Sequence, residues 1–376
     1  MLYFDHNATH PLLPSAREAW LNAATTITAN PSSPHRPGTR ASNALEDART
    51  RLATILRCES RDIVWTGGAT EAVNTAIRHF SLADPMGEIW FSEIEHPCTL
   101  GAAARWFEGR ICSLPATRRG VLDLDHLRER LKTARPGLVA VMAANNETGI
   151  LQPWREAGDL CREQGVPFLC DAAQWVGRLP AAGLGECTAV AGCAHKFGGP
   201  LGVGFLKGPE RMSPLLVGGP QEDARRAGTE NLPGILGMLA ALEECEGKLA
   251  IAVPVSPRDT FIRALLEALP GTEIVGAGGD RLWNTVTAIL PAPIDCRQRW
   301  VVKLDRAGCA ASTGSACASG KEQTSHVLAA QGISPEQAGR TIRFSAGWST
   351  TEGDWADLLA IIQKAAVSMR TMDGEG

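Results

Sequence analysis

The sequence contains no long apolar run, no concentrated positive charge and no closely spaced pair of cysteines. Nowhere do 18 apolar residues follow one another, so we expect no helix that spans a membrane. The 37 basic and 41 acidic side chains give a net charge of −4 without a basic run, which argues against direct contact with nucleic acid. The 11 cysteines are odd in number and show no C-x-x-C spacing, which excludes a fully paired disulfide framework and a zinc-ligand pattern. We therefore expect no metal site and mostly reduced, buried thiols.

The amino-terminal residues and the composition favour a globular, cytoplasmic protein. Residues Met1–Asp5 lack the positively charged and apolar stretches of a secretory signal. With 376 residues, 44% of them hydrophobic and 21% charged, the chain has enough material for one large or two moderate domains.

Short apolar strands alternate with helical patterns through the first two thirds of the chain. We expect strands at 63–66, 89–92, 111–114, 138–143, 166–170, 188–193 and 202–207. We expect helices at 15–24, 40–56, from the turn at 67–71 to about 79, and at 96–107, 125–132, 154–164 and 234–248. This alternation predicts an α/β fold with a mostly parallel sheet covered by helices on both faces. A proline-marked break at 253–257 precedes a second unit of mixed helices and short strands.

Four of the expected strands end on polar residues that a buried core does not require. The Gly-Gly-Ala-Thr turn at 67–70 could hold a phosphate with backbone N–H groups at a helix start. Asn145–Asn146 follows a second strand, Asp171 with Gln174 a third, and His195–Lys196 a fourth. Taken singly, each has an ordinary explanation as a tight turn, a polar turn, a helix cap or a surface lysine. Together, at the edge where open parallel sheets bind ligands, they supply a lysine, a carboxylate and a phosphate cradle, which is the set that a pyridoxal phosphate site requires.

Motifs along almost the whole chain resemble those of one enzyme family. Their order and spacing are similar to the cysteine desulfurases of the NifS/IscS group, within the class V, fold-type-I family of pyridoxal phosphate enzymes. The matching motifs are Asn7–Thr9, Asn30–Ser33, Gly67–Glu71, Glu95–His96, Asn145–Glu147, Asp171–Gln174, His195–Lys196, Gly228–Thr229, Gly314–Cys317 and Ile342–Ser345.

The resemblance implies roles for residues that bind the cofactor, pyridoxal 5'-phosphate. Lys196 would hold it covalently and later move protons, His96 would stack on its ring and assist acid–base steps, and Asp171 would keep the ring nitrogen protonated. Gln174 would hydrogen-bond the ring oxygen. The remaining implied cofactor contacts are Ala69, Thr70, Asn146, Cys193, His195 and, reaching over from the other subunit of a homodimer, Thr229.

The resemblance also implies how L-cysteine is bound and desulfurated. Asn146 and Arg343 would hold the substrate carboxylate, for which a guanidinium offers two parallel donors. Cys317 lies in a loop of glycine, serine and alanine, which suits a mobile nucleophile; without the motif, an inert loop thiol would be the more ordinary explanation. As a thiolate it would attack the substrate sulfur, leaving L-alanine and a persulfide that passes to a protein sulfur acceptor in iron–sulfur cluster assembly or a thio-modification pathway.

The implied fold is a fold-type-I pyridoxal phosphate-dependent transferase. It would have a large domain on a mostly parallel seven-stranded sheet and a smaller α+β C-terminal domain. We expect an N-terminal arm at 1–15 packing with the small domain, the large domain at 16–255, and the small domain at 256–376 with the catalytic cysteine loop.

Three positions depart from the family pattern, and three alternative functions remain open. Cys193 stands where the group usually has a serine that bonds the phosphate, and a thiol is a weaker hydrogen-bond partner. His10 replaces a usual threonine, and Trp348 stands where arginine is frequent. The alternatives are a class V aminotransferase, a lyase acting on selenocysteine or another amino acid, and a non-catalytic assembly subunit that binds the cofactor.

Overall fold

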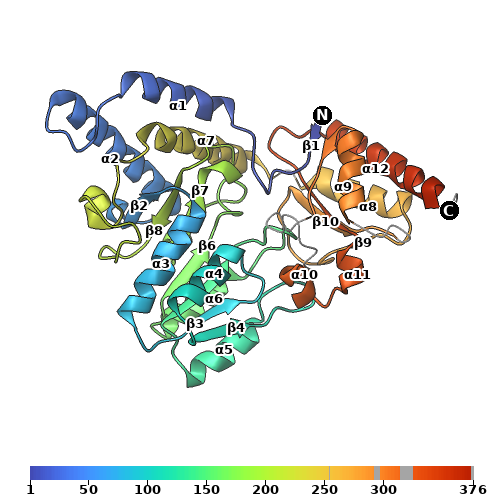
Figure 1. The fold of residues 1–376 in the computed structure, drawn as a ribbon, viewed down its shortest axis with the longest axis horizontal. Helices are drawn as coiled ribbons and strands as arrows, with labels where there is room; N and C mark the ends of the chain where they lie inside the picture. The colour runs from blue at the N-terminus through green and yellow to red at the C-terminus, as the bar shows by residue number, and fades with distance from the viewer. Residues whose placement is uncertain (254, 292–296, 314–324, 374–376) are drawn as a thin grey trace.

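The computed structural model describes residues 1–253, 255–291, 297–313 and 325–373 (Figure 1). The strands are β1 (Leu2–Tyr3), β2 (Ile63–Thr66), β3 (Ile89–Ser92), β4 (Ile111–Leu114), β5 (Leu138–Met142), β6 (Phe168–Asp171), β7 (Ala189–Cys193), β8 (Gly204–Lys207), β9 (Glu273–Ile274), β10 (Thr285–Ile289), β11 (Cys309–Ala310) and β12 (Thr341–Ser345). The α-helices are α1 (Pro14–Thr26), α2 (Arg36–Leu56), α3 (Ala69–Ala83), α4 (Pro97–Trp106), α5 (Leu124–Thr133), α6 (Trp154–Glu163), α7 (Leu232–Ile251), α8 (Ser256–Ala268), α9 (Arg297–Arg306), α10 (His326–Ala330), α11 (Pro335–Ala338) and α12 (Glu352–Asp373). Short 3-10 helices are η1 (Ser60–Asp62), η2 (Leu184–Glu186), η3 (Ala194–Lys196) and η4 (Gln221–Ala224).

The large sheet has seven strands in the order β2-β8-β7-β6-β5-β3-β4. Neighbouring strands from β7 to β4 are parallel, whereas β8 runs antiparallel to both β7 and β2. Every residue of β5, β6 and β7 is buried, because helices cover both faces of these central strands. The predicted mostly parallel, seven-stranded sheet is therefore confirmed.

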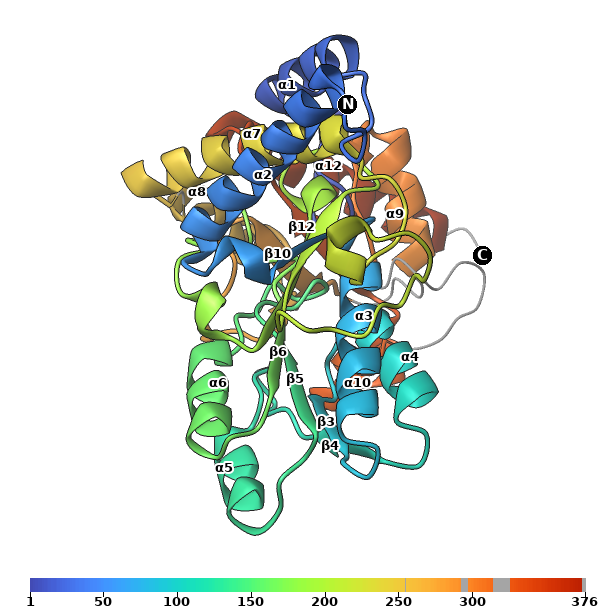
Figure 2. The same ribbon diagram turned by 90° about the vertical axis from the view of Figure 1, so that its left-hand side faces the viewer.

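Helices cover both faces of this sheet. On one face α3 and α4 pack against Val64, Ala140 and Leu206, and on the other α2, α5, α6 and α7 pack against Val139, Val141 and other core residues. Figure 2 shows α5 and α6 on one side of the strands and α3 and α4 on the opposite side. The sheet is thus the middle of three layers, and only its strand ends are left to form a site.

A second core lies around the three-stranded sheet β12-β10-β9, whose strand pairs are antiparallel. Helices α8, α9 and α12 pack on it, and Phe4 from the N-terminal segment joins the same core. Strand β1 pairs in parallel with β11, so the N-terminal segment lies in this part of the molecule beside α9 and α12 (Figure 1). The domain limits at 15 and 255 stay a prediction.

Element boundaries follow local sequence signals closely. The strands expected at 63–66, 89–92 and 111–114 have those limits in the structure. The helix expected from residue 40 begins earlier, at Arg36, because His35 caps it through a hydrogen bond from the backbone N–H of Gly38 and a proline occupies its first turn. The strand expected at 166–170 runs from Phe168 to Asp171, so the carboxylate belongs to the strand itself. Among the described residues, no helix is long and apolar enough to cross a bilayer.

Candidate active site

A cavity of about 1030 Å³ opens where β5, β6 and β7 end and where α3, α4 and α10 begin. Its wall contains ten of the twelve residues predicted to act on cofactor or substrate: Ala69, Thr70, His96, Asn146, Asp171, Gln174, Cys193, His195, Lys196 and Arg343. Most of the residues predicted from the sequence therefore lie around one cavity.

Lys196 lies on the cavity wall at the end of η3, directly after β7. Its Nζ donates to the backbone oxygens of Asn7 at 2.7 Å and Ala8 at 2.8 Å. Burial lowers the pKa of Lys196 from 10.5 to about 8; Cys193 and Asp171 oppose this shift. A larger fraction of this amine is therefore neutral near pH 7 than of an ordinary lysine, which favours its reaction with a carbonyl group.

Asp171 ends β6 and faces the same cavity. One carboxylate oxygen, Oδ1, accepts from the backbone N–H of Ala173 at 3.0 Å. Burial raises the pKa of Asp171, against the influence of His96, the Ala173 amide and Lys196. A buried carboxylate in this position is stabilised by a cationic partner.

Gln174 is oriented by a buried arginine. Arg178 donates to the side-chain oxygen of Gln174, which leaves the amide nitrogen to donate to the backbone oxygen of Asn7 at 3.0 Å. Arg178 also donates to the backbone oxygen of His6 at 3.0 Å, so it ties the N-terminal segment to this wall of the cavity.

The glycine turn before α3 has the geometry of an anion cradle. Gly68, at φ 153° and ψ 176°, adopts a conformation that is essentially restricted to glycine, and no side chain caps the helix that follows. The first-turn N–H groups of α3 are therefore directed at the cavity edge with the positive end of the helix dipole. Glu71 holds the turn by accepting from the Gly67 N–H at 2.7 Å, and Arg226 pairs with Glu71 at 2.9 Å.

His195 and Cys193 border this cradle with weakly polar groups. The hydroxyl of Thr9 donates to the backbone oxygen of Ala8 at 2.8 Å, so its oxygen accepts from Nδ1 of His195, 3.2 Å away. Burial lowers the pKa of His195 to about 4. Burial also raises the pKa of the Cys193 thiol to about 11. An anion bound here would draw a proton onto Nε2 of His195.

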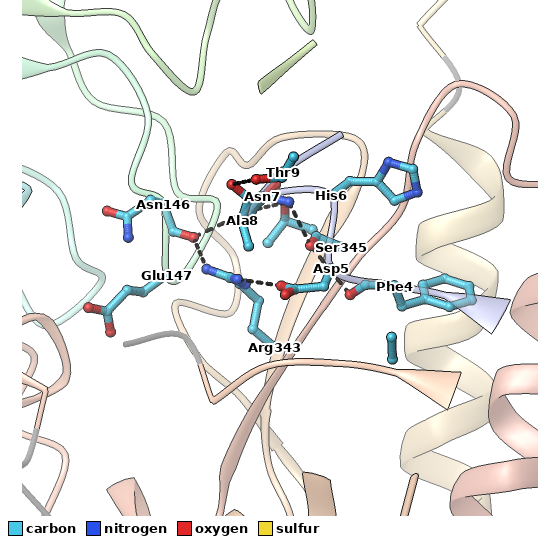
Figure 3. Close-up of polar contacts among 12 residues, drawn as sticks. Phe4, Asp5, His6, Asn7, Ala8, Thr9, Asn146, Glu147, Arg343 and Ser345 are labelled. Carbon is cyan, nitrogen blue, oxygen red and sulfur yellow. Dashed lines mark hydrogen bonds and ion pairs between the residues drawn. The ribbon is translucent and has the colours of Figure 1, made fainter. Parts of the chain in front are cut away.

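Arg343 on β12 is buried and already engaged on both sides (Figure 3). One terminal nitrogen donates to the backbone oxygen of Asn146 at 2.7 Å, and the other pairs with the Asp5 carboxylate at 2.7 Å. Figure 3 shows the Asn146 amide directed away from Arg343. A substrate carboxylate would therefore have to share these donors with Asp5.

Several cavity residues were not predicted from the sequence. Asn7 and Ala8 contribute backbone oxygens, and Glu147, Ser325 and His326 contribute side chains. The Asn7–Thr9 motif was a usable signal for the first two, and the Asn145–Glu147 motif for Glu147. The short segment before α10 offered none, because its approach to the cavity depends on tertiary contacts such as the 2.6 Å bond from Ser325 Oγ to Glu147 Oε2.

Two predicted residues are not on the described cavity wall. Thr229 is exposed and does not line it. Cys317 lies outside the described residues. Among the residues that are described, no cluster of histidine, cysteine or carboxylate side chains could hold a metal ion.

Comparisons with known proteins show the family and the fold to which this chain is similar. The family model described as Aminotransferase class-V matches residues 2–358. A cysteine desulfurase of Klebsiella pneumoniae is 39% identical over 358 residues, covering 93% of this chain and 89% of the relative. A solved NifS-like protein is similar with a TM-score of 0.88 at 28% identity, covering 97% of this chain and 99% of its own. The structure of SspA in complex with cysteine is similar with a TM-score of 0.79 at 27% identity, covering 92% and 98% of the two chains.

Proposed function

The chain belongs to the class V aminotransferase family and, within it, to the cysteine desulfurases; on this basis we propose that its cavity binds pyridoxal phosphate and converts L-cysteine to L-alanine. The fold is that of the fold-type-I pyridoxal phosphate enzymes, as the likeness to NifS-like structures confirms. The observation that carries the proposal is the meeting of Lys196, Asp171 and the uncapped start of α3 around one cavity.

The residues present fit this cofactor. Asp171 is a buried carboxylate that a protonated ring nitrogen would neutralise, and the N–H groups at Ala69 and Thr70 suit a phosphate. Lys196 offers a partly neutral amine for covalent attachment. When bound, pyridoxal phosphate supplies an electron sink for charge that develops on the substrate carbon skeleton.

The chain's own groups would then bind and orient L-cysteine. Arg343 would hold the carboxylate with help from Asn146, and Lys196 would move the proton at the substrate α-carbon. The likeness to SspA in complex with cysteine supports this substrate.

The nucleophile that takes the sulfur would be Cys317. The two thiols on the described cavity wall are poor candidates, because burial raises the pKa of Cys98 far above its ordinary value and that of Cys193 to about 11. In the proposed step the Cys317 thiolate forms an S–S bond to the substrate sulfur while the substrate's C–S bond breaks. The carbon gains a proton to give L-alanine, and Cys317 keeps the persulfide for a protein acceptor.

We further propose a homodimeric, cytoplasmic enzyme in which Thr229 serves the cavity of the other subunit. Exposure of Thr229 away from its own cavity supports this assignment. The protein acceptor of sulfur would belong to iron–sulfur cluster assembly or to a thio-modification pathway.

The direct test measures the products that the loaded protein makes from L-cysteine. We expect L-alanine and sulfide in equal amounts when a thiol reductant is present. A Lys196→Ala variant, refolded or purified in parallel with excess cofactor, should form neither product. Formation of a keto acid instead of L-alanine would identify an aminotransferase and refute the proposal.

A further inference from the structure

Arg178 is a buried cation whose charge no described carboxylate neutralises. Only 2% of the residue is exposed, and its guanidinium donates to the backbone oxygen of Gln174 at 3.2 Å, to the side-chain oxygen of Gln174 and to the backbone oxygen of His6 at 3.0 Å. These acceptors are uncharged, and no carboxylate of the described residues pairs with the guanidinium. Burial lowers the pKa of Arg178 to about 10, and the groups that oppose this shift are the Cys193 and Cys245 thiols. Because a buried charge without an opposite charge is costly, an anionic group bound nearby would be stabilised.

The guanidinium fixes the orientation of the Gln174 amide. A guanidinium can only donate, so the atom of Gln174 that faces Arg178 is the oxygen, and the nitrogen is at the other end. That nitrogen, Nε2, donates to the backbone oxygen of Asn7 at 3.0 Å. A carbonyl oxygen can only accept, so both contacts require the same orientation. Arg178 therefore makes the end of the amide that is farther from it a donor.

This donor end lies beside the amine that would carry the cofactor. Nζ of Lys196 donates to the same Asn7 oxygen at 2.7 Å, so the two nitrogens are separated by no more than the two bonds together. Lys196 and Gln174 both line the cavity. The amide nitrogen carries two hydrogens, and among the described residues only the Asn7 oxygen accepts one of them. The second hydrogen is available to an oxygen of a ligand attached at Lys196.

Backbone bonds hold Gln174 and Arg178 together. The two residues are four positions apart in a turn in which the N–H of Arg178 donates to the backbone oxygen of Trp175 at 3.0 Å, so their side chains lie on one side, as in a helix. The backbone oxygen of Arg178 accepts from Nε1 of the buried Trp283 at 2.9 Å. Because these bonds use backbone groups of residue 178, a change of its side chain leaves them in place.

We propose that Arg178 is a positioning residue for the cofactor: it turns the donor end of the Gln174 amide toward the ring oxygen of pyridoxal phosphate and places a positive charge behind that bond. The inference rests on the proposed function, because it concerns how the same cavity recognises its cofactor. The ring hydroxyl of this cofactor is acidic, and a donor that a cation polarises stabilises its anion better than an isolated amide does.

The test compares two cofactors that differ only at this oxygen. Pyridoxal 5'-phosphate has the ring hydroxyl, and 3-deoxypyridoxal 5'-phosphate has a hydrogen in its place. The dissociation constant of each is measured by equilibrium titration for the parent, Arg178→Met and Arg178→Lys. We expect Arg178→Met to bind pyridoxal phosphate about 10-fold more weakly than the parent does, with almost no change for the deoxy analogue. Arg178→Lys keeps the charge and a donor, so it should keep most of the parent's preference for pyridoxal phosphate.

Arg258→Met is the matched control. Arg258 is also buried and donates to the backbone oxygens of Arg281 at 3.1 Å and Leu282 at 2.8 Å, but it does not line the cavity. Its replacement should leave the preference between the two cofactors unchanged. If Arg178→Met does not fold, Arg178→Gln takes its place, because a neutral amide can still donate to the His6 oxygen; its preference should fall in the same direction.

The outcomes separate this inference from the proposed function. Equal weakening of both cofactors in Arg178→Met would mean that Arg178 only stabilises the fold, and it would overturn the inference, as would an unchanged preference. If Arg178 sets the preference but the parent makes no L-alanine from L-cysteine, the desulfurase proposal fails and the role of Arg178 stands. If the parent makes L-alanine and sulfide while Arg178→Met keeps the preference, the role of Arg178 fails and the desulfurase proposal stands.

Discussion

Lys196 should make the cofactor-free protein markedly more stable at high pH. Burial lowers its pKa from 10.5 to about 8; Arg178 and Arg343 act in the same direction, and Cys193 and Asp171 oppose it. Between these two pH values the unfolded chain binds more protons at this group than the folded chain does. The free energy of unfolding therefore rises with pH across this window.

The magnitude follows from the shift. Each pKa unit corresponds to about 1.4 kcal/mol, so the folded state loses about 3 kcal/mol below pH 8 by burying this ammonium group. Because the amine faces a cavity that water can enter, we expect about 2–3 kcal/mol in practice. The perturbation is Lys196→Met, which keeps most of the length of the side chain and removes the charge.

The assay compares denaturant unfolding of the cofactor-free parent and Lys196→Met at pH 7.5 and pH 10. The variant also loses two hydrogen bonds to backbone oxygens, but in the simplest case that loss is the same at both pH values. Between the two pH values, we expect the free energy of unfolding of the parent to rise by about 2 kcal/mol relative to that of the variant. If the free energy of unfolding changes by the same amount in both proteins, Lys196 is not a buried lysine that loses its proton easily. The loaded parent, in which the amine is used for attachment, serves as the control and should show no such gain.

Three further predictions concern stability and cofactor affinity. Burial lowers the pKa of His6 to about 3 and that of His10 to about 4, so the free energy of unfolding should fall as the pH drops below 6.5, by about 2 kcal/mol per ring at pH 5. Denaturant unfolding at pH 7 and pH 5 should show a smaller fall in the free energy of unfolding for His10→Asn than for the parent. An equal fall in the two proteins would contradict this. Arg49→Met should lower the free energy of unfolding by about 3–5 kcal/mol, because it leaves the buried Glu222 carboxylate without the arginine that contacts it at 2.8 Å. The double variant with Glu222→Met should recover most of the loss in the denaturation midpoint. No recovery would argue against a charge effect. Cys193→Ser should tighten cofactor binding several-fold in an equilibrium titration, because a hydroxyl is the better hydrogen-bond partner by about 1 kcal/mol; weaker binding would mean that the thiol does not face the phosphate.

Local sequence patterns were sufficient for the sheet and for expecting several polar strand ends to meet at one edge of it. The strands Ile63–Thr66 and Ile89–Ser92 each have three consecutive apolar residues followed by a hydroxyl residue and are flanked by charged or glycine residues, so their limits could be read directly. Asp171 and Lys196 could be placed together because the carboxyl ends of parallel strands share one edge of the sheet.

The parts that could not be predicted depend on contacts between distant residues. Lys196 bonds to Asn7 across 189 positions of the chain, and Arg343 pairs with Asp5 across 338. The residues of β8 do not indicate that this strand runs antiparallel to β7, which is seen only from their pairing in the sheet. His326 carries no motif in its own neighbourhood, and its place on the cavity wall depends on a tertiary contact between its Nε2 and the backbone oxygen of Glu95.

The most direct test of the central claim compares sulfur release by three forms of the loaded protein. The parent, Cys317→Ala and the matched control Cys112→Ala are incubated with L-cysteine. Cys112 lies on the edge strand β4, away from the cavity. Sulfide is measured with reductant, and protein-bound persulfide is measured by mass spectrometry without it. The account predicts L-alanine, sulfide and a persulfide on Cys317 for the parent and the control, and none of these for Cys317→Ala. Equal sulfide release by Cys317→Ala would contradict it, because the cofactor site alone would then eliminate the sulfur.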